Sequence, residues 1–422
     1  MLDAKIIRDQ PEIIKQVLAK RQIEFPLNEL LELDEKRRSL ITEAQELKHK
    51  RNVVSEQIAM KKKEDQEASS VISEMRAISD KITALDGEID STGKRYSQLM
   101  LTLPNLIDES VPEGRDENDN VEVRRWGEPR RFSFKTKDHI DLGLSLKLID
   151  LDRAAKTSGA RFYFLKGDLV KMNYALIQFA INFLKKKNYT LIQTPYMINR
   201  KAMEGTIIVS DFGDVIYKVE NEDLYLIGTS EHAIVAMHMD EIFDAKQLPI
   251  RYAGISPCFR KEAGTHGKDT KGIFRVHQFE KAEQLVFAKP EESWAEHEKM
   301  IRNAEEFFQL LGIPYRIVLL CTADLGKISA KTYDLEAWMP GQNAYREVVS
   351  CSNCIDYQAR RLGVKYRDKP HEESKFVHTI NSTLVATERT LVAMLENYQT
   401  EKGTITVPDV LQPYMDGVKE ID

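Results

Sequence analysis

The stretch RYAGISPCFRKEAGTHGKDTKGIFRVHQFEKAEQLVF, residues 251–287, decides the fold of the larger part of this 422-residue chain. Its flanks, Arg251–Phe259 and Ile273–Phe287, are strand candidates, and the loop KEAGTHGKDTKG between them carries three glycines. Two strands joined by a glycine-containing loop indicate a long β-hairpin.

Further strand candidates lie on both sides of this hairpin. They are Tyr189–Thr194, which stops at Pro195, the pair Tyr315–Leu320 and Tyr333–Trp338, then Arg346–Ser350 and Phe376–Ile380. Helical spacing covers Leu169–Lys187 and about Leu384–Tyr398. Many strands joined by hairpins, with helices packed around them, predict an antiparallel α+β domain rather than a doubly wound one. The sequence has no GxGxxG and no GxxxxGKS/T pattern, which argues against a Rossmann or P-loop nucleotide site.

The first hundred residues follow a different pattern. Apolar residues recur at alternating spacings of four and three from Leu33 to Ile58, and again from Val71 to Leu103. In the first series six of eight positions are apolar, and in the second nine of ten. This spacing indicates a coiled-coil seam, and the polar stretch Lys61–Ser70 is short enough to reverse the chain. We therefore expect two antiparallel helices packed as a hairpin, each on the order of 40 Å long at ~1.5 Å per residue.

Charge separates between the two arms of this hairpin. Residues 36–63 hold nine Lys or Arg and three Glu, whereas residues 64–90 hold eight acids and two bases. Opposite charges beside the seam can simply set the pairing of the helices, and solvated charged faces are the more common case. The alternative is a basic face for a phosphate backbone. Its candidate residues are Lys48, Lys50, Arg51 and the cluster Lys61–Lys63.

The composition restricts the class of protein. Hydrophobic residues make up 42% and charged residues 30%, with a net charge of −6, so any nucleic-acid surface must be local. The four cysteines are sparse, which fits a reducing compartment. The N-terminus shows no signal-peptide pattern, and no run approaches the ~20 apolar residues of a membrane span. We expect a soluble, cytoplasmic protein without membrane contact.

Residues 104–135 change in character, with three prolines, two glycines and dense mixed charge. This composition predicts a linker that holds a short strand at Asn120–Val123. The expected organisation is a first domain at residues 1–110 with its arm at about 28–103, a linker at 111–135, and an α+β domain at 136–422.

Three segments place charged or small polar side chains in strand or hairpin settings. Arg260 ends one hairpin strand and acids follow along the other, which can form a small polar pocket. Glu347 puts a carboxylate on a strand, as a divalent cation requires. Asn381-Ser-Thr383 stands at the start of the last predicted helix, where it can act as a cap, and Arg389 lies two turns in. An arginine in an apolar helix needs a buried acid or an anionic ligand, although strand-edge charges and helix caps are each common alone.

Together these segments resemble the class II aminoacyl-tRNA synthetases. Tyr189–Pro195 resembles motif 1, Phe259–Lys281 motif 2 and Asn381–Tyr398 motif 3. Within the class, the chain resembles the seryl-tRNA synthetase family nearly from end to end. The strings that carry the resemblance are NVEVRRWGEPR, GTSEH, FRKEAGTHGKDTKGIFRVHQFEKAE, PGQNAYREVVSCSNCIDYQARR and RTLVAMLENYQ. Asn381-Ser-Thr and Ser352-Asn-Cys-Ile-Asp are more similar to archaeal and eukaryotic members than to common bacterial ones.

The resemblance implies a fold and an activity. The fold would be an N-terminal antiparallel coiled-coil hairpin that binds tRNA, followed by a class II antiparallel β-sheet catalytic domain flanked by helices. The enzyme would be a serine–tRNA ligase that uses ATP and Mg²⁺ and works as a homodimer. It would convert L-serine and ATP to seryl-adenylate and pyrophosphate, then transfer serine to the 3′ end of tRNA(Ser), with tRNA(Sec) as a second candidate substrate.

The resemblance also implies the roles of individual residues. Arg260 and Arg389 would be catalytic, gripping the phosphates and stabilising charge at the α-phosphorus. The serine site would consist of Thr229, Glu231, Arg260, Glu283, Asn381 and Thr383. The ATP site would consist of Arg260, Lys261, Glu262, Val276, Phe279, Glu347, Val348, Val349, Ser350 and Arg389, with Mg²⁺ on Glu347 and Ser350. The tRNA contacts would be Lys48, Lys50, Arg51, Lys61 and Lys62 on the arm and Lys268 and Lys271, with His266, in the hairpin loop, where a solvated surface is the alternative.

Two features stand apart from these roles. Cys351 and Cys354 form one CxxC without a partner pair, so a structural role is favoured over a redox or zinc site. Glu388 precedes the motif 3 arginine, where the family usually has a small residue such as Gly or Ser. This acid is expected either to pair with Arg389 or to point to solvent.

Two rival functions predict different sequences. A paralogue that loads a carrier protein instead of tRNA should lack the helical hairpin. A catalytically dead RNA-binding or regulatory protein should have lost Arg260, Glu347 or Arg389. The chain has the hairpin pattern and all three residues, which favours the ligase.

Overall fold

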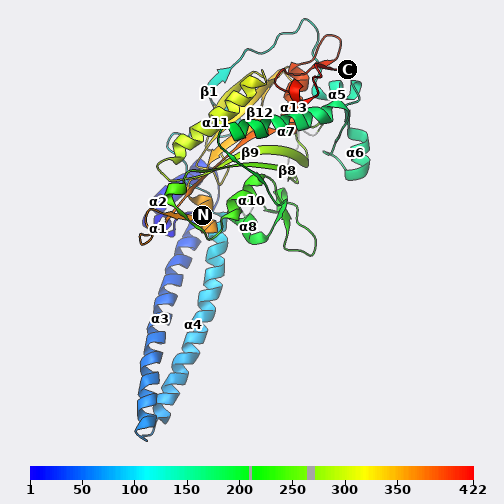
Figure 1. Ribbon diagram of the computed structural model, residues 1–422. Helices are drawn as coiled ribbons and strands as arrows, with labels where there is room; N and C mark the ends of the chain where they lie inside the picture. Colours follow the sequence, from blue (N-terminus) through cyan, green and yellow to red (C-terminus); the bar gives the residue numbers. More distant parts are fainter. Residues whose placement is uncertain (209–211, 264–270) are drawn as a thin grey trace. The chain divides into compact units, whose positions relative to one another are not determined.

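The computed structural model describes residues 1–208, 212–263 and 271–422. The chain forms two compact units, and Figure 1 colours it along the sequence. The helical unit comprises Asp3–Ala19 and Ile23–Leu103, and the larger unit comprises Met1–Leu2, Lys20–Gln22 and Pro104–Asp422. Both arms of the expected hairpin therefore belong to one unit, and every predicted strand belongs to the other.

The helical unit is built on two long helices, α3 (Leu27–Lys63) and α4 (Ser69–Thr102), which run side by side in Figure 1. Two shorter helices precede them, α1 (Ala4–Asp9) and α2 (Pro11–Lys20). The long helices have 37 and 34 residues, or roughly 50–55 Å each at 1.5 Å per residue. They exceed the expected length because α3 continues beyond its apolar series through Lys61–Lys63, and cations suit the last turn of a helix.

The seam between α3 and α4 is buried at the positions that the heptad spacing predicts. Arg37, one of the two arginines in the seam, lies over the ring of Tyr96, with its Cζ 5.3 Å from the ring centroid. A cation over an aromatic face explains how a charged residue is accommodated there. The buried seam residues form two apolar clusters, Leu40 with Ala44 and Leu85, then Val54 with Ile78 and Ile82. The predicted helical hairpin is confirmed.

Charges beside the seam pair across the two helices. Lys48 Nζ lies 2.9 Å from Asp86 Oδ1, and Lys50 Nζ lies 3.0 Å from Glu74 Oε1. These exposed ion pairs match the reading in which opposite charges set the pairing, although each such pair stabilises by only ~0–1 kcal/mol. At the end of α3, Lys62 is exposed and Lys61 is half-buried. Arg51, further back along the helix, is also half-buried.

The larger unit is centred on an eight-stranded sheet in the order β1-β10-β11-β12-β15-β9-β8-β4. Neighbouring strands are antiparallel except for β4 and β8, which are parallel. The expected mostly antiparallel α+β fold is confirmed, and β1, inside the predicted linker, forms one edge. The strands are β1 (Val121–Trp126), β4 (Thr190–Gln193), β8 (Ile250–Phe259), β9 (Gln278–Ala288), β10 (Tyr315–Leu319), β11 (Lys331–Met339), β12 (Ala344–Asn353) and β15 (His378–Ala386).

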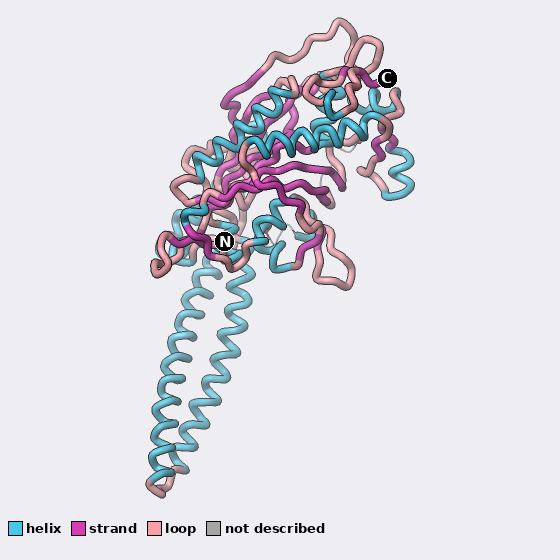
Figure 2. The backbone as a smooth tube through the Cα atoms, viewed as in Figure 1, coloured by secondary structure: helices cyan, strands magenta, loops and turns pink. Residues whose placement is uncertain are grey.

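Helices pack against this sheet in two groups, and Figure 2 shows the strands between them. One apolar cluster joins the sheet to α7 (Asp168–Lys186), α11 (Ser293–Leu310) and α13 (Thr387–Asn397). A second cluster holds α8 (Arg200–Thr206), α10 (Ser230–Met237) and α12 (Tyr357–Leu362).

Strand β9 shows how the sheet separates its core from its polar surface. Ala282, Val286 and Ala288 belong to the first apolar cluster, whereas Leu285 and Phe287 belong to the second. Successive side chains of a strand point to opposite faces. Lys281 and Glu283 therefore continue the face of Leu285 beyond the apolar cluster.

Two of the boundaries that differ from the sequence prediction concern residues of the predicted site. The second hairpin strand, predicted from Ile273, begins only at Gln278. Asn381–Thr383, predicted at the start of the last helix, lies inside strand β15, and Arg389 is the third residue of α13. The helix-cap interpretation was wrong because β15 pairs along its length with β9, with Asn381 opposite Leu285 and Thr383 opposite Glu283. Pairing between distant strands outweighs local capping preferences.

Short elements complete the larger unit, and no described helix is both long and apolar enough to cross a membrane. The short helices are α5 (His139–Ser145), α6 (Leu151–Ser158) and α9 (Phe212–Val215), with 3₁₀ turns at Glu117–Asp119, Ala245–Gln247 and Gln412–Tyr414. The short strands are β2 (Ile149–Asp150), β3 (Phe164–Leu165), β5 (Met197–Ile198), β6 (Tyr225–Leu226), β7 (Ile242–Asp244), β13 (Lys365–Arg367), β14 (Lys375–Phe376), β16 (Ile405–Thr406) and β17 (Glu420–Ile421).

Candidate active site

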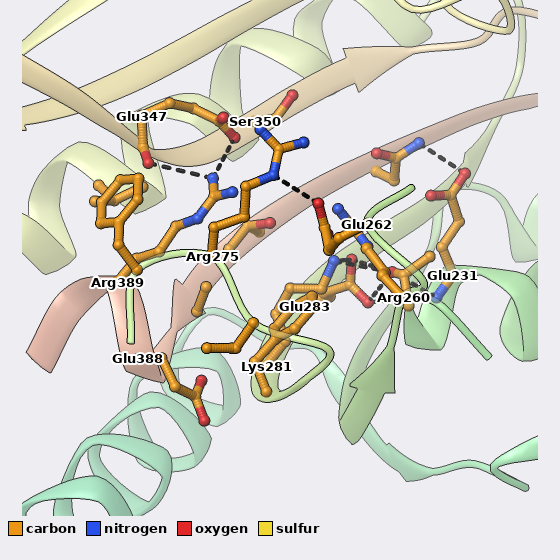
Figure 3. A pocket seen from close by; sticks show the side chains of 18 residues that line it. Glu231, Arg260, Glu262, Arg275, Lys281, Glu283, Glu347, Ser350, Glu388 and Arg389 are labelled. Carbon is orange, nitrogen blue, oxygen red and sulfur yellow. Dashed lines mark hydrogen bonds and ion pairs between the residues drawn. The ribbon is translucent and has the colours of Figure 1, made fainter. Parts of the chain in front are cut away.

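A polar cavity lies where β8, β9, β12 and β15 meet the starts of α10 and α13 (Figure 3). It brings together residues that are more than a hundred positions apart in the sequence. The predicted serine and ATP residues that line it are Thr229, Glu231, Arg260, Glu262, Val276, Phe279, Glu283, Glu347, Val348, Ser350, Asn381, Thr383 and Arg389. It is also lined by Phe274, Arg275, Lys281, Ala386 and Glu388.

Glu283 is 2% exposed, and Lys281, Thr229, Ser230 and the Glu231 backbone N–H all bond it. Lys281 Nζ lies 2.5 Å from Glu283 Oε1 and donates to Thr229 Oγ1 at 2.9 Å. The Thr229 hydroxyl donates to Glu283 Oε1 at 2.6 Å, and the Ser230 hydroxyl donates to Oε2. Burial alone would raise the pKa of Glu283, but the Lys281 ammonium and the hydroxyl donors outweigh it and hold that pKa below its usual value. Glu283 is therefore ionised at neutral pH.

Glu231 is a second buried acid in a different electrostatic setting. It lies in the first turn of α10, and its Oε1 accepts from Gln358 Nε2 at 2.7 Å and from Asn381 Nδ2 at 3.0 Å. Burial, and then repulsion from Glu283, raises the pKa of Glu231 to about 7. The two acids are thus separated in protonation, and a cationic ligand group beside Glu231 would lower its pKa again.

Arginine and an acid meet at the other end of the cavity. Arg389 Nη1 lies 3.0 Å from Glu347 Oε1 and donates to the Glu347 carbonyl oxygen at 3.2 Å. The Arg389 Cζ lies 5.1 Å from the ring centroid of Phe274. Burial acts to raise the pKa of Glu347, but the Arg389 guanidinium outweighs it and lowers that pKa. The acid that an arginine in this helix requires is therefore Glu347.

Arg260 and Glu262 follow directly after strand β8. Arg260 Nε donates to the Gly228 carbonyl oxygen at 3.2 Å, and its Cζ lies 5.2 Å from the ring centroid of Phe279. Glu262 Oε2 accepts from Arg275 Nε at 2.6 Å. Figure 3 shows Arg260 beside Glu231 and Arg389 beside Glu347, so each end of the cavity has its own arginine.

Glu347 and Ser350, the predicted Mg²⁺ ligands, lie on strand β12, and a third candidate oxygen ligand lies nearby on the next strand. Asp334 on β11 stands opposite Ser350 in the strand register, and burial together with Glu347 raises the pKa of Asp334 well above its usual value. Asp334 Oδ1 is buried and has no hydrogen-bond partner among the described residues. Hard cations such as Mg²⁺ take oxygen ligands, so two carboxylates and a hydroxyl, one with an unpartnered oxygen, fit such an ion.

Glu388 meets neither of the two expectations for it. It is 2% exposed, so it does not point to solvent. Its Oε2 accepts from the Glu280 backbone N–H and from Thr387 Oγ1, each at 3.0 Å, and its Oε1 accepts from the Tyr163 hydroxyl. Burial raises the pKa of Glu388 to about 7. Figure 3 shows its carboxylate directed away from Arg389.

Several predicted residues stand outside the cavity lining. Lys261 Nζ donates to the Gly213 carbonyl oxygen at 3.0 Å, and Val349 is 1% exposed in the apolar core. Lys271 is exposed, whereas Lys268 and His266 lie outside the described residues. The placements of Lys261 and Val349 put them behind the lining residues rather than among them.

The four cysteines are buried and free. Cys351 Sγ contacts the His297 carbonyl oxygen at 3.7 Å, and burial raises the pKa of both Cys351 and Cys354. Buried thiols with raised pKa values are unreactive, which favours the structural role over a redox role.

Sequence reasoning missed Lys281, Gln358 and Asp334 as functional candidates. Lys281 had a signal, because it alternates with Phe279 and Glu283 on one strand and so shares their face. Gln358 and Asp334 had none, since only the packing of α12 and β11 brings them to Glu231 and Ser350.

Comparisons with known proteins match both parts of the chain. Residues 1–107 match the seryl-tRNA synthetase N-terminal domain, and residues 217–398 match the tRNA synthetase class II core domain (G, H, P, S and T). A serine–tRNA ligase from Nitrosopumilus maritimus is 56% identical over 421 residues and is covered completely, as is this chain.

Two solved structures have the same fold. The seryl-tRNA synthetase from Pyrococcus horikoshii complexed with ATP has a TM-score of 0.94 and 49% identity, covering 100% of this chain and 99% of its own. The cytoplasmic serine–tRNA ligase from Naegleria fowleri in complex with AMP has a TM-score of 0.87 and 42% identity, again covering 100% and 99%. The chain therefore belongs to the seryl-tRNA synthetase family, the class II enzymes that join serine to tRNA.

Proposed function

We propose that the polar cavity activates L-serine with ATP through the residue roles given below. The observation that carries this assignment is the division of one cavity into an end with two acids, Glu231 and Glu283, and an end where Arg389 meets Glu347. Carboxylates suit the α-ammonium group of an amino acid, and arginines suit a polyphosphate. Arg260 lies beside Glu231 at the acidic end, where it could meet both the serine carboxylate and the α-phosphate.

The acidic end would bind serine. Glu231 takes the α-ammonium group, and Glu283, fixed by Lys281 and Thr229, accepts the serine hydroxyl or its amine. Asn381 and Thr383 on β15 close this end of the cavity. A site built to bond a hydroxyl rejects alanine, because its buried polar groups would be left unpaired.

The remaining lining residues would bind ATP. Phe279 stacks on the adenine, Glu262 and Val276 line its edge, and Arg260 and Arg389 hold the phosphates. A relative of known structure is a complex with ATP, which supports this assignment. Glu347 and Ser350 would hold Mg²⁺, with Asp334 as a further oxygen ligand, and the ion when bound would neutralise phosphate charge.

Activation then requires positioning rather than proton transfer. A serine carboxylate oxygen attacks the α-phosphorus, the new P–O bond forms as the bond to the bridging oxygen breaks, and pyrophosphate leaves. Arg260 and Arg389 stabilise the charge that develops at the α-phosphorus. In the second step a ribose hydroxyl at the 3′ end of tRNA attacks the serine carbonyl carbon, and AMP leaves.

The helical unit would recognise the tRNA. We assign this role to residues 1–110, with the linker at 111–135 and the catalytic domain at 136–422. Lys61 and Lys62, at the C-terminal end of α3, would contact the phosphate backbone of tRNA(Ser), and tRNA(Sec) is the second candidate substrate. Lys271, at the edge of the hairpin loop, is the described candidate for the acceptor end.

We also infer a homodimer in the cytoplasm. Tyr189–Pro195 resembles the dimer-forming motif 1, and β4 is an edge strand with Leu191 40% exposed, so an apolar edge is available for a second subunit. One relative is a cytoplasmic enzyme, which supports the location.

Serine-dependent ATP–pyrophosphate exchange tests the activation step. Exchange should depend on serine above the other amino acids, and exchange without that preference would refute the assignment of the acidic end. Deletion of residues 36–95 should leave exchange nearly intact and abolish aminoacylation of tRNA(Ser). If aminoacylation survived that deletion, the role given to the arm would be wrong. If the acceptor were a carrier protein instead of tRNA, serine would be transferred to a thiol or amine of that protein.

A further inference from the structure

Residues 161–163, Arg-Phe-Tyr, lie between α6 and β3, outside the segments that line the cavity. Each of the three residues contacts a segment that carries a residue of the ATP site. These contacts reach the end of β8, the approach to β9 and the first turn of α13. No local pattern in the sequence marks this segment as functional.

The N-terminal contact joins this segment to both sides of the β8–β9 hairpin. Arg161 Nη1 donates to the Glu262 carbonyl oxygen at 3.0 Å, and the His277 backbone N–H donates to the Arg161 carbonyl oxygen at 3.1 Å. Arg161 and Glu262 both have left-handed backbone, with φ of 62° and 50°. Such conformations are uncommon outside glycine and persist where surrounding contacts fix them. Two left-handed residues at one contact indicate that the surrounding structure holds the backbone of Arg161 and Glu262 in place despite the conformational free energy that this costs.

The central contact passes through an imidazole to the catalytic arginine. The rings of Phe162 and His277 lie 5.1 Å apart, and His277 Nδ1 lies 2.8 Å from the Arg260 carbonyl oxygen. The Arg260 backbone N–H in turn donates to the His277 carbonyl oxygen at 2.9 Å. Phe162 therefore packs on the residue that fixes the backbone of Arg260.

The C-terminal contact reaches the other arginine. The Tyr163 hydroxyl donates to Glu388, which also accepts from the Glu280 backbone N–H at 3.0 Å. Glu280 follows Phe279, and Glu388 precedes Arg389. The Glu388 carboxylate thus ties the first turn of α13 to β9 just beyond the last paired residues, Ala386 and Lys281.

We propose that Arg161–Tyr163 is a positioning strap, which holds the β8–β9 hairpin and the start of α13 in a fixed relation so that Arg260, Phe279 and Arg389 meet ATP together. The inference rests on the proposed ATP roles of those three residues. It also assigns a purpose to Glu388, the buried acid that directly precedes Arg389. Glu388 is the anchor that receives the strap, not a ligand of Arg389.

The strap predicts an effect on ATP that a general loss of packing would not produce. Tyr163→Phe removes one hydroxyl, and Glu388→Ser removes the carboxylate that accepts from it. Each variant should raise the KM for ATP in exchange by at least about tenfold, equivalent to about 1.4 kcal/mol, with the KM for serine within about twofold of wild type. The double variant should resemble Glu388→Ser alone, because that substitution already removes the hydrogen bond that Tyr163→Phe removes.

Tyr315→Phe is the matched control. Tyr315, on strand β10, is buried, whereas Tyr163 is half-buried, and the Tyr315 hydroxyl likewise donates to a carboxylate, that of Glu305 on α11, at 3.2 Å. It should change the melting temperature as Tyr163→Phe does and leave the KM for ATP unchanged. Arg161→Lys tests the other end of the strap and should raise the KM for ATP as Tyr163→Phe does, so the proposal stays testable if one variant folds poorly.

Three results would overturn the strap. They are an unchanged KM for ATP in the folded Tyr163→Phe and Arg161→Lys variants, an equal change in Tyr315→Phe, and losses that multiply in the double variant. Failure of the proposed activation step would appear differently, as an absence of serine-dependent exchange in the wild-type enzyme itself.

Discussion

Replacement of Lys281 by methionine should separate the charge of the acidic end from its packing. Methionine keeps most of the apolar stem of lysine and removes the ammonium group. Glu283 would then be a buried carboxylate that retains the hydroxyl donors of Thr229 and Ser230 and the Glu231 backbone N–H. The substitution removes one ion pair, in which both side chains are almost fully buried, and the hydrogen bond from Lys281 to Thr229.

The magnitude follows from the burial of Glu283. Removing one partner of a buried ion pair costs about 3–5 kcal/mol, and we expect about 3 kcal/mol because two hydroxyls still bond the acid. In the wild type the pKa of Glu283 is lowered, so its contribution to stability is present above the unfolded pKa and is lost as the pH falls. Without Lys281, burial raises that pKa instead, so the penalty appears as the pH rises above the unfolded value. The loss should therefore be about 3 kcal/mol at pH 8 and about 1 kcal/mol at pH 5, where the acid protonates.

Urea unfolding of the variant and the wild type at the two pH values measures this difference. Lys281→Met combined with Glu283→Gln should recover most of the loss at pH 8. Lys187→Met, which removes a partly exposed partner of Glu306, is the matched control and should cost less than about 1 kcal/mol at either pH. An equal loss at pH 5 and pH 8 would refute the electrostatic reasoning and leave packing as the cause.

Three further predictions concern the other charged groups. Because burial raises the pKa of Glu231 to about 7, ionisation of this acid costs stability as the pH rises above the ordinary pKa of a glutamate. In urea unfolding, Glu231→Gln should therefore gain up to ~3 kcal/mol of stability at pH 8 and little at pH 4.5, and it should lose serine-dependent exchange. A gain that does not depend on pH would contradict this reasoning. Arg389→Met should lower kcat for exchange by roughly 10²–10³-fold, as loss of a donor to developing charge does, and a change confined to the KM for ATP would show that Arg389 only binds. The double substitution Lys61→Ala and Lys62→Ala should reduce the slope of log K for tRNA binding against log salt concentration by about 0.7–0.9 per lost phosphate contact. Lys48→Ala, which loses an ion pair with Asp86, should leave that slope nearly unchanged. Equal slopes for both variants would favour the alternative that Lys61 and Lys62 are only solvated.

The spacing of apolar residues was sufficient to predict those helices whose buried face repeats at the same period. The heptad spacing from Leu33 to Ile58 placed the seam because these positions form one face of the helix, and that face packs against the other helix in two apolar clusters. The same reasoning failed at Asn381–Thr383, where the residue types suit a helix cap and also fit a polar strand. Only the pairing of β15 with β9, about a hundred residues earlier, decides between them.

In the candidate site, too, the sequence predicted some residues and not others. The motifs supplied Arg260, Glu283 and Arg389, and the structure gathers them in one cavity. Some of the groups that bond the acids of the site come from elsewhere in the chain, as Gln358 on α12 does for Glu231. A pattern of residue types shows which groups are present, but the pKa of a buried acid depends on neighbours that only the tertiary fold brings close.

The charges around the acidic end explain how one small cavity could bind a zwitterion and leave its carboxylate reactive. Lys281 neutralises Glu283, so the remaining acid, Glu231, is the group whose charge responds to the ligand. Burial and the neighbouring Glu283 raise the pKa of Glu231 to about 7, so this acid is only partly ionised near neutral pH. On the proposed roles, an arriving ammonium group would favour the ionised form and would itself be compensated, while the serine carboxylate would be directed toward Arg260 and the phosphates. An amine without the carboxylate would gain the first interaction but leave Arg260 without a partner for the second. On these roles the cavity selects its ligand by requiring both charges at once, and the hydroxyl acceptor Glu283 adds the selection for serine.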